Sequence, residues 1–202
     1  MKNKKEQILD VSLALFLEKG YDNTSISDIL SKLDIARGTL YYHFESKEAI
    51  MDMIIERSAK QIVEDAEKIV LQEELTVYEK MFSLFASMSM KRLAGGDLMI
   101  DYLNQPQNAL FHEKSNRAFM KNITPLLGEI IKERFEEGLF DNIFPYESAE
   151  TILIMIMGFV DGQYEQLNKN DLERRVESLL YNMERVLGAK EGSFAKFKTL
   201  AL

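Results

Sequence analysis

The chain has 202 residues, 46% hydrophobic and 29% charged, with only 3 Pro and 10 Gly, which is a globular composition that favours helix. It contains no Cys, so disulfides, thiolate metal ligands and thiol nucleophiles are excluded. Residues 1–50 carry 7 Lys+Arg against 8 Asp+Glu within a total net charge of −8, so the acidic body argues against a nucleic-acid coat but permits a local basic surface.

The N-terminal quarter predicts three short helices. Apolar residues recur at helical spacing from Lys5 to Lys19, and Gly20 suits the left-handed position that ends a helix. Thr24 and Ser25 can cap a short second helix, whose apolar face consists of Ile26, Ile29, Leu30 and Leu33. A tight connection through Asp34 leads to a third helix, whose core-facing stripe is formed by Ala36, Leu40 and Phe44.

The rest of the chain predicts further helices. Ser46 can cap a fourth, and no Pro or Gly follows before Gly95, with a break expected near Glu73 to Thr76. Later helices are expected at Asp97 to Asn104, Asn108 to Asn122, Pro125 to Glu137, Pro145 to about Leu167, and Asn170 to Gly188. No strand pattern competes, so we predict an all-α fold.

The second and third helices have the spacing of a helix-turn-helix, whose second helix enters the major groove. The spacing alone is weakly specific, but the outward side of the third helix is rich in hydrogen-bond donors and has no acid before Glu45. Such donors can bind base edges and phosphates. Gly38 costs about 1 kcal/mol of helix propensity, which suits a backbone that approaches another surface closely. The alternative is that the tyrosines only pack and that Lys47 is a solvated charge.

This segment resembles the DNA-binding domain of the TetR family of repressors. The matching residues are Gly20-Tyr21, Thr24-Ser25, Ile29, Arg37 through Phe44, Ser46-Lys47-Glu48 and Ile50. The remainder of the chain agrees in layout only, with further helices and a Glu137-Gly138-Leu139-Phe140 turn before a helix near Pro145.

The resemblance implies which residues contact DNA. Ser25 and Ser27 begin the second helix, residues 36–39 begin the base-reading helix, and the following tyrosines, histidine and lysine hold the backbone. With the basic candidate Lys4, the predicted DNA-binding set is Lys4, Ser25, Ser27, Ala36, Arg37, Gly38, Thr39, Tyr41, Tyr42, His43 and Lys47.

Two residues depart from the family pattern. Asp34 replaces the usual turn glycine, and Asp tolerates the left-handed conformation, so the turn should survive. Ala36 replaces a frequent capping Ser, so the third helix should be less rigid before DNA binds.

The resemblance also implies three regions: a DNA-binding domain at 1–47, a helical regulatory, ligand-binding and dimerisation domain at 48–188, and a C-terminal tail at 189–202.

The segment 152–160 is apolar on every side, so its helix should be buried all round. We expect a homodimer, with a monomeric core as the alternative. The expected dimer contacts are Ile152, Ile156, Val160, Leu172, Val176, Leu179 and Met183.

Aromatic and Met side chains are abundant in the regulatory region, and Met suits adaptable pockets. Helical stripes of Phe and Met form core more often than pocket, but their number favours a small, mainly apolar inducer. The expected ligand-binding residues are Phe82, Phe85, Met88, Tyr102, Phe119, Met155 and Phe159.

Other classes of protein are less consistent with the sequence. An enzyme would have to work with two histidines, His43 and His112, without a phosphate-binding glycine loop or metal-ligand spacing, so we expect no catalysis, metal or cofactor. A protein-binding N-terminal domain would need an apolar outer face on the third helix.

The polar start of the chain is not a signal peptide, and the run from Ile152 to Val160 is shorter than the roughly 20 residues that span a bilayer, so we expect a cytoplasmic protein.

The sequence therefore predicts a ligand-responsive transcriptional repressor. It should bind a palindromic double-stranded operator as a homodimer and be released by an inducer. An activator, or a constitutive binder without ligand, would have the same sequence features.

Overall fold

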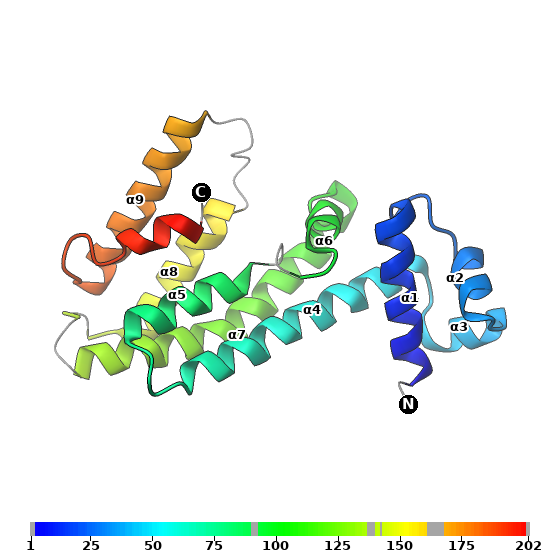
Figure 1. The fold of residues 1–202 in the computed structure, drawn as a ribbon, viewed down its shortest axis with the longest axis horizontal. Coiled ribbons are helices and arrows are strands. Elements are labelled where there is room, and N and C mark those ends of the chain that lie inside the picture. Colours follow the sequence, from blue (N-terminus) through cyan, green and yellow to red (C-terminus); the bar gives the residue numbers. More distant parts are fainter. Residues whose placement is uncertain (1–2, 90–92, 137–139, 142, 161–167, 201–202) are drawn as a thin grey trace. The chain divides into compact units, whose positions relative to one another are not determined.

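The computed structural model describes residues 3–89, 93–136, 140, 141, 143–160 and 168–200, and every regular element among them is helical (Figure 1). The expected all-α fold is confirmed. No helix in this described part is long and apolar enough to cross a membrane. The elements are α1 (Lys4–Lys19), α2 (Ile26–Leu33), α3 (Arg37–His43), α4 (Lys47–Val70), α5 (Val77–Met88), α6 (Gly96–Leu103), η2 (Pro106–Asn108), α7 (Ala109–Glu136), α8 (Pro145–Val160), α9 (Lys169–Leu187) and η4 (Ala195–Leu200).

Contacts divide the chain into two compact units. The first consists of Met1–Ile62 and Ser89–Asn116, and the second of Val63–Met88 and Arg117–Leu202. The first unit therefore takes in α6 and residues 48–62 of α4, which were expected in the regulatory domain. The functional division at residues 47 and 188 stays a prediction.

The core of the first unit joins the three N-terminal helices to α4 and α6. Phe16 on α1, Ile29 on α2 and Leu40 on α3 are fully buried. Burying an aliphatic or aromatic side chain of this size contributes about 1.5–3 kcal/mol. The same cluster includes Ile50, Met51, Ile54 and Ile55 from α4 and Met99, Tyr102 and Leu103 from α6.

The ends of the short helices follow their sequences. Gly20 ends α1 at φ 84°, where a residue without Cβ is favoured. Ser25 caps α2 through a reciprocal capping box with Asp28. Asp34 adopts the left-handed conformation at φ 50°, which confirms the expectation for this turn, and Ala36 gives α3 no side-chain cap, also as expected.

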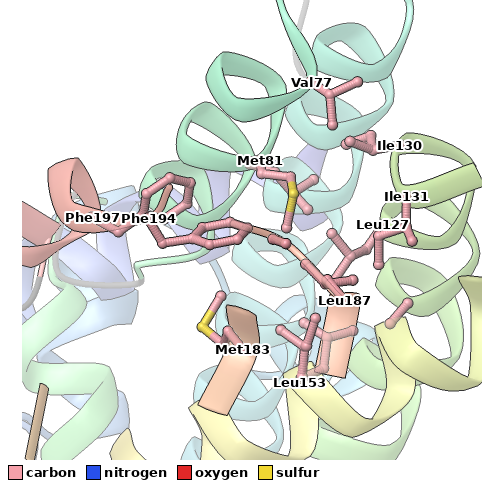
Figure 2. Packing of buried hydrophobic residues seen from close by; sticks show 14 of the residues in the cluster. Val77, Met81, Leu127, Ile130, Ile131, Leu153, Met183, Leu187, Phe194 and Phe197 are labelled. Atoms are coloured by element: carbon pink, nitrogen blue, oxygen red, sulfur yellow. The ribbon is translucent and has the colours of Figure 1, made fainter. Parts of the chain in front are cut away.

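The core of the second unit is built from the end of α4 and from α5, α7, α8 and α9, with the C-terminal segment added to it (Figure 2). Met81, Leu127, Leu153, Met183 and Leu187 are buried there. The helix α8 is not buried all round as its composition predicts, because Ile154 is 58% exposed.

A break predicted before Pro125 is wrong, because α7 is one helix with Pro125 inside it. An interior proline removes one backbone hydrogen bond and costs about 3 kcal/mol. Pro125 is exposed, so water can solvate the carbonyl that loses its donor, whereas Ile123, Leu127 and Ile130 are fully buried and hold both halves of the helix.

Residues 189–200 also differ from the expected tail. They contain the short helix η4, and Phe194 is fully buried in the core of the second unit together with Phe197, which is 5% exposed. The weak periodicity of this segment hid two aromatic anchors.

Gly188 provides a stability test for the entry to this segment. It lies at φ +63°, and a Cβ there would come within 2.9–3.0 Å of Asp141, including its backbone N and O. We expect Gly188→Ala to lower the free energy of unfolding by about 2 kcal/mol or more, through left-handed strain and overpacking. Gly192→Ala is the control, because Gly192 has φ +83° with nothing within 4 Å, and should cost only about 1 kcal/mol. Urea unfolding followed by circular dichroism measures both, and equal losses would contradict the contact with Asp141.

The capping box predicts a pH dependence. Hydrogen bonds from the Ser25 hydroxyl and amide, and then from Lys19, hold the pKa of the Asp28 carboxyl well below its usual range. A lowered folded-state pKa contributes stability above the unfolded pKa of about 3.9, and this contribution is lost as the pH falls further. Asp28→Asn should therefore destabilise the protein at pH 6, and the difference from wild type should shrink below about pH 4. Melting temperatures across pH 3 to 7 would test this, with exposed Asp22→Asn as the control.

Candidate nucleic-acid interface

The outward side of α3 is polar and open. Arg37, Gly38, Tyr41 and Tyr42 are exposed, and Tyr42 is 84% exposed, whereas Leu40 is fully buried. Nothing lies within 4 Å of the position that a Cβ on Gly38 would take. One face of this helix therefore holds the core while the other offers donors to a partner.

Ala36 does not belong to the buried stripe, and that expectation is wrong. Ala36 is exposed, whereas Leu40 and Phe44 are buried as predicted. The reason is that Ala36 is the N-cap, with extended backbone at φ −68° and ψ 148°, so it lies outside the helical register that places residues four apart on one face.

Aromatic contacts order the long side chains of α3. The Arg37 guanidinium lies 5.4 Å from the centre of the Tyr41 ring and 3.5 Å from its hydroxyl. The rings of Tyr42 and His43 meet edge to face at 4.9 Å. These contacts restrict the side chains on the exposed face, which reduces the entropy lost when a ligand immobilises them.

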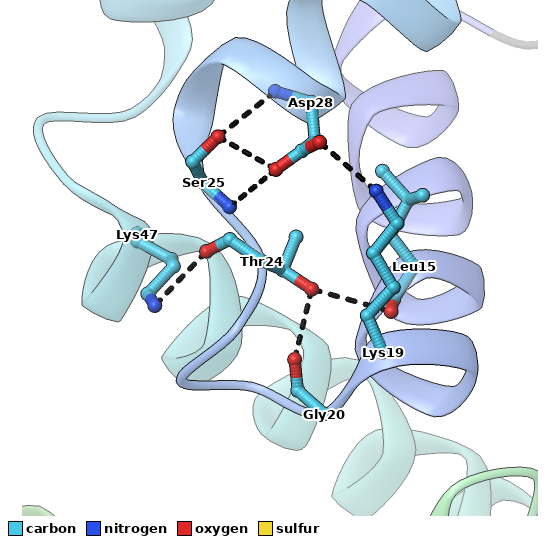
Figure 3. A network of polar contacts seen from close by, with 7 residues as sticks. All are labelled: Leu15, Lys19, Gly20, Thr24, Ser25, Asp28 and Lys47. Carbon is cyan, nitrogen blue, oxygen red and sulfur yellow. Dashed lines mark hydrogen bonds and ion pairs between the residues drawn. The ribbon is translucent and has the colours of Figure 1, made fainter.

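Lys47 fixes the segment before α2 (Figure 3). Its ammonium donates to the carbonyls of Tyr21 at 2.8 Å and Thr24 at 3.0 Å and lies 4.2 Å from the Tyr21 ring. The buried Thr24 hydroxyl lies 2.8 Å from the carbonyl of Gly20 and 3.2 Å from that of Leu15. Lys47 thus positions the helix-turn-helix, and its predicted phosphate contact stays a prediction.

The other predicted DNA-binding residues differ in their surroundings. Ser25 is exposed and donates to Asp28 at 2.6 Å within the capping box. Ser27 is exposed near the start of α2. Lys4 is half-buried and donates to Gln7 at 2.8 Å. Thr39 and His43 are half-buried on the flanks of α3.

Sequence reasoning missed the polar contacts that join α4 to α1 and α6. Arg57 binds Glu6 at 2.9 Å and Asp10 at 2.8 Å. The Tyr102 hydroxyl donates to Asp52 at 3.1 Å, and burial raises the pKa of both groups. No local spacing could reveal these pairs, because their members lie about fifty positions apart in the chain.

The predicted ligand-binding residues fall into two groups. Phe82, Phe85, Met88, Phe119, Met155 and Phe159 are partly buried and pack against the core of the second unit. Tyr102 belongs to the core of the first unit instead. It is therefore not gathered with the other six.

Three of the six described residues that are predicted to form the dimer interface are buried within the protomer, and the interface itself stays a prediction. Ile152, Val176 and Met183 are buried, whereas Ile156, Leu172 and Leu179 are partly buried. The side chain of Val160 lies outside the described residues. Other apolar side chains of these two helices reach solvent: Ile154 on α8 is 58% exposed and Tyr181 on α9 is 51% exposed.

Among the described residues no three His, Asp or Glu side chains gather as a metal site would require. His43 lies beside Tyr42 on α3, and His112 is on α7. The chemistry that the α3 surface can supply is hydrogen bonding and positive charge, which suits a polyanion.

Two family models match the chain. The model for bacterial regulatory proteins of the tetR family matches residues 8–54. The model for a tetracyclin repressor-like C-terminal domain matches residues 97–180, so together the two models cover well over half of the chain.

Known proteins are similar in sequence or in fold. Over 51 residues the chain is 43% identical to IcaR of Staphylococcus aureus (strain Newman), the HTH-type negative transcriptional regulator of the biofilm operon icaADBC. That match covers 25% of this chain and 27% of IcaR, so the chain spans about a quarter of the curated relatives that it matches.

Solved structures match along nearly the whole length. A TetR/AcrR-family regulator from Thermobifida fusca has a TM-score of 0.61 at 21% identity, with 92% of this chain and 97% of that chain covered. SmeT, the repressor of the Stenotrophomonas maltophilia multidrug efflux pump SmeDEF, has a TM-score of 0.62 at 18% identity, with 96% and 94% covered. SmeT has also been solved with triclosan, and that complex has a TM-score of 0.60 at 19% identity, with 94% and 93% covered.

At these identities the solved structures establish the fold, and the two matching models extend the likeness to both parts of the sequence. The chain belongs to the TetR family of bacterial regulatory proteins.

Proposed function

We propose that this protein is a transcriptional repressor that binds a palindromic operator as a homodimer and is released by a small, mainly apolar inducer. Its relatives are transcriptional regulators and not enzymes. IcaR is a negative regulator and SmeT is a repressor, which favours repression over activation.

The observation that carries the proposal is the exposed face of α3. Leu40 anchors the helix, while Arg37, Tyr41 and Tyr42 are exposed around the open backbone of Gly38. An arginine that reads guanine beside tyrosines that hold phosphates is a typical arrangement for direct readout in the major groove. The base-reading role falls to residues 36–39, and the positioning role to Ser25, Ser27, Tyr41, Tyr42 and His43.

An inducer can act only if it binds two conformations of the repressor unequally. Helix α4 carries residues of both units, and Lys47 at its start holds the segment before α2. A ligand bound among the six apolar residues that pack on the core of the second unit would favour one of the two positions of α4. The two recognition helices of a dimer would then no longer fit major grooves about 34 Å apart. The solved complex of SmeT with triclosan supports a small, mainly apolar ligand.

Selection from a random duplex library would test DNA recognition directly. We expect an enriched palindrome whose affinity falls steeply as salt rises from 50 to 200 mM, because phosphate contacts release counterions. Arg37→Ala should cost about 1–3 kcal/mol and relax the preference at one base position in each half-site. Lys121→Ala, which removes the same charge from an exposed position on α7, is the control and should bind like wild type. Retention of DNA without an enriched sequence would contradict specific operator binding.

Gly38 gives a sharper test of the recognition surface. Gly38→Ala should stabilise the protein by up to about 1 kcal/mol, because alanine favours helix and nothing occupies the space of its Cβ. We expect the same substitution to weaken operator binding at least tenfold, because the methyl group would stand between the backbone and DNA. Thermal unfolding and fluorescence anisotropy measure the two effects. Unchanged anisotropy would mean that the backbone at position 38 does not approach the duplex.

The dimer is proposed to form through exposed side chains of α8 and α9. Ile154→Asp should raise the dimer dissociation constant at least tenfold, because a charge would be buried without a partner. Leu110→Asp, on a residue of α7 that is 63% exposed, is the matched control. Sedimentation velocity distinguishes the states, and a dimer that survives Ile154→Asp at low micromolar concentration would rule out this surface.

A further inference from the structure

The C-terminal residues 189–199, here called the strap, return to the core of the second unit. Phe194 is fully buried and Phe197 is 5% exposed. Between them and α9 the chain turns at Gly188 and Gly192, both at positive φ. The strap is therefore a turn followed by two aromatic anchors.

Phe197 covers two of the predicted ligand-binding residues. Its ring meets Phe82 edge to face at 5.4 Å and Phe85 at 5.8 Å, both on α5. Phe194 meets Phe197 at 4.9 Å and Tyr78 at 5.5 Å. Edge-to-face pairs at such distances add stability beyond that of burial alone. The aromatic face of α5 thus already holds a benzyl group supplied by the chain itself.

A buried carboxylate holds the strap in place. Glu184 on α9 is 3% exposed, and it accepts a hydrogen bond from the Phe194 amide at 3.0 Å. Farther along, Lys198 binds Glu177 at 2.7 Å on the surface, where an ion pair is worth little. Glu184 is the main polar anchor of the strap, because loss of the Phe194 amide would leave a buried carboxyl oxygen without this donor.

We propose that the strap is an internal stand-in for the effector: Phe197 occupies the aromatic site on α5, and an effector binds there by displacing the strap. This inference rests on the proposed ligand response and specifies its regulation. The effector must replace both groups that leave, the ring on Phe82 and Phe85 and the N–H donor to Glu184. It is therefore an aromatic molecule that carries an N–H or O–H group, and molecules without that donor bind weakly.

N-phenyl-1-naphthylamine fits this description and becomes fluorescent in apolar surroundings, so it can serve as the probe. The test uses the purified wild-type protein in the oligomeric state that it adopts in solution. Hydrogen–deuterium exchange is measured over residues 189–199. Saturating probe should accelerate exchange in the strap at least tenfold, because the Phe194 amide leaves Glu184. Bound probe with unchanged or slower exchange in the strap would overturn the proposal.

Variants of the strap give a second, independent measurement. Phe197→Ala should raise probe affinity at least tenfold, since apparent affinity increases with the fraction of open site. Phe197→Trp should restore wild-type affinity, and exposed Glu191→Ala is the matched control within the strap. The N-methylated probe, which lacks the donor, should bind Phe197→Ala about tenfold more weakly than the parent probe. Equal affinity of all four proteins, or binding to none of them, would contradict the strap as a competitor.

Operator binding separates this inference from the proposed function. If the probe displaces the strap but the operator stays bound, the strap inference stands and the ligand response fails. If an apolar ligand releases the operator without changing exchange in the strap, the response stands and the strap inference fails.

Discussion

A helix of 7 residues is not stable alone in water, and the surface proposed to read DNA lies on one. What holds α3 is the burial of Leu40 and Phe44 in a core that also contains Phe16 of α1, Ile29 of α2 and several residues of α4. Because one stripe supplies the stability, the opposite face is free to carry groups that contribute nothing to folding. Gly38 and the exposed Tyr42 are tolerated for that reason.

The polar contacts around this core set the geometry of the helix-turn-helix. Lys47 binds two carbonyls before α2, Thr24 ties the same turn to α1, and Arg57 joins α4 to α1 through two carboxylates. The contacts of Lys47 and Arg57 join segments that are more than twenty positions apart in the chain, whereas Thr24 and Leu15 are nine positions apart. A motion of α4 would therefore move the turn before α2 through the hydrogen bonds of Lys47, and a substitution of Lys47 would remove this coupling.

The second unit uses its aromatic residues in a different way. Phe82 and Phe85 look like ligand contacts from their positions on α5, yet Phe197 already lies against both. An apolar surface exposed to water is unfavourable, so a site built for an aromatic ligand needs something to cover it when the ligand is absent. The strap meets this need, with Glu184 supplying the directional bond.

The sequence by itself determined the elements whose signals are local. Helical periodicity, the capping Ser25 and Ser46, the left-handed Asp34 and the terminal Gly188 predict the helices and their ends, and the residues of α3 predict its outward chemistry. Only the tertiary structure decided what depends on partners far along the chain. It kept α7 continuous through Pro125, assigned Ile152 and Met183 to the protomer core, and brought Phe197 onto α5. The physical reason is that burial and ion pairing depend on three-dimensional neighbours, whereas capping and helical periodicity depend on residues only a few positions apart.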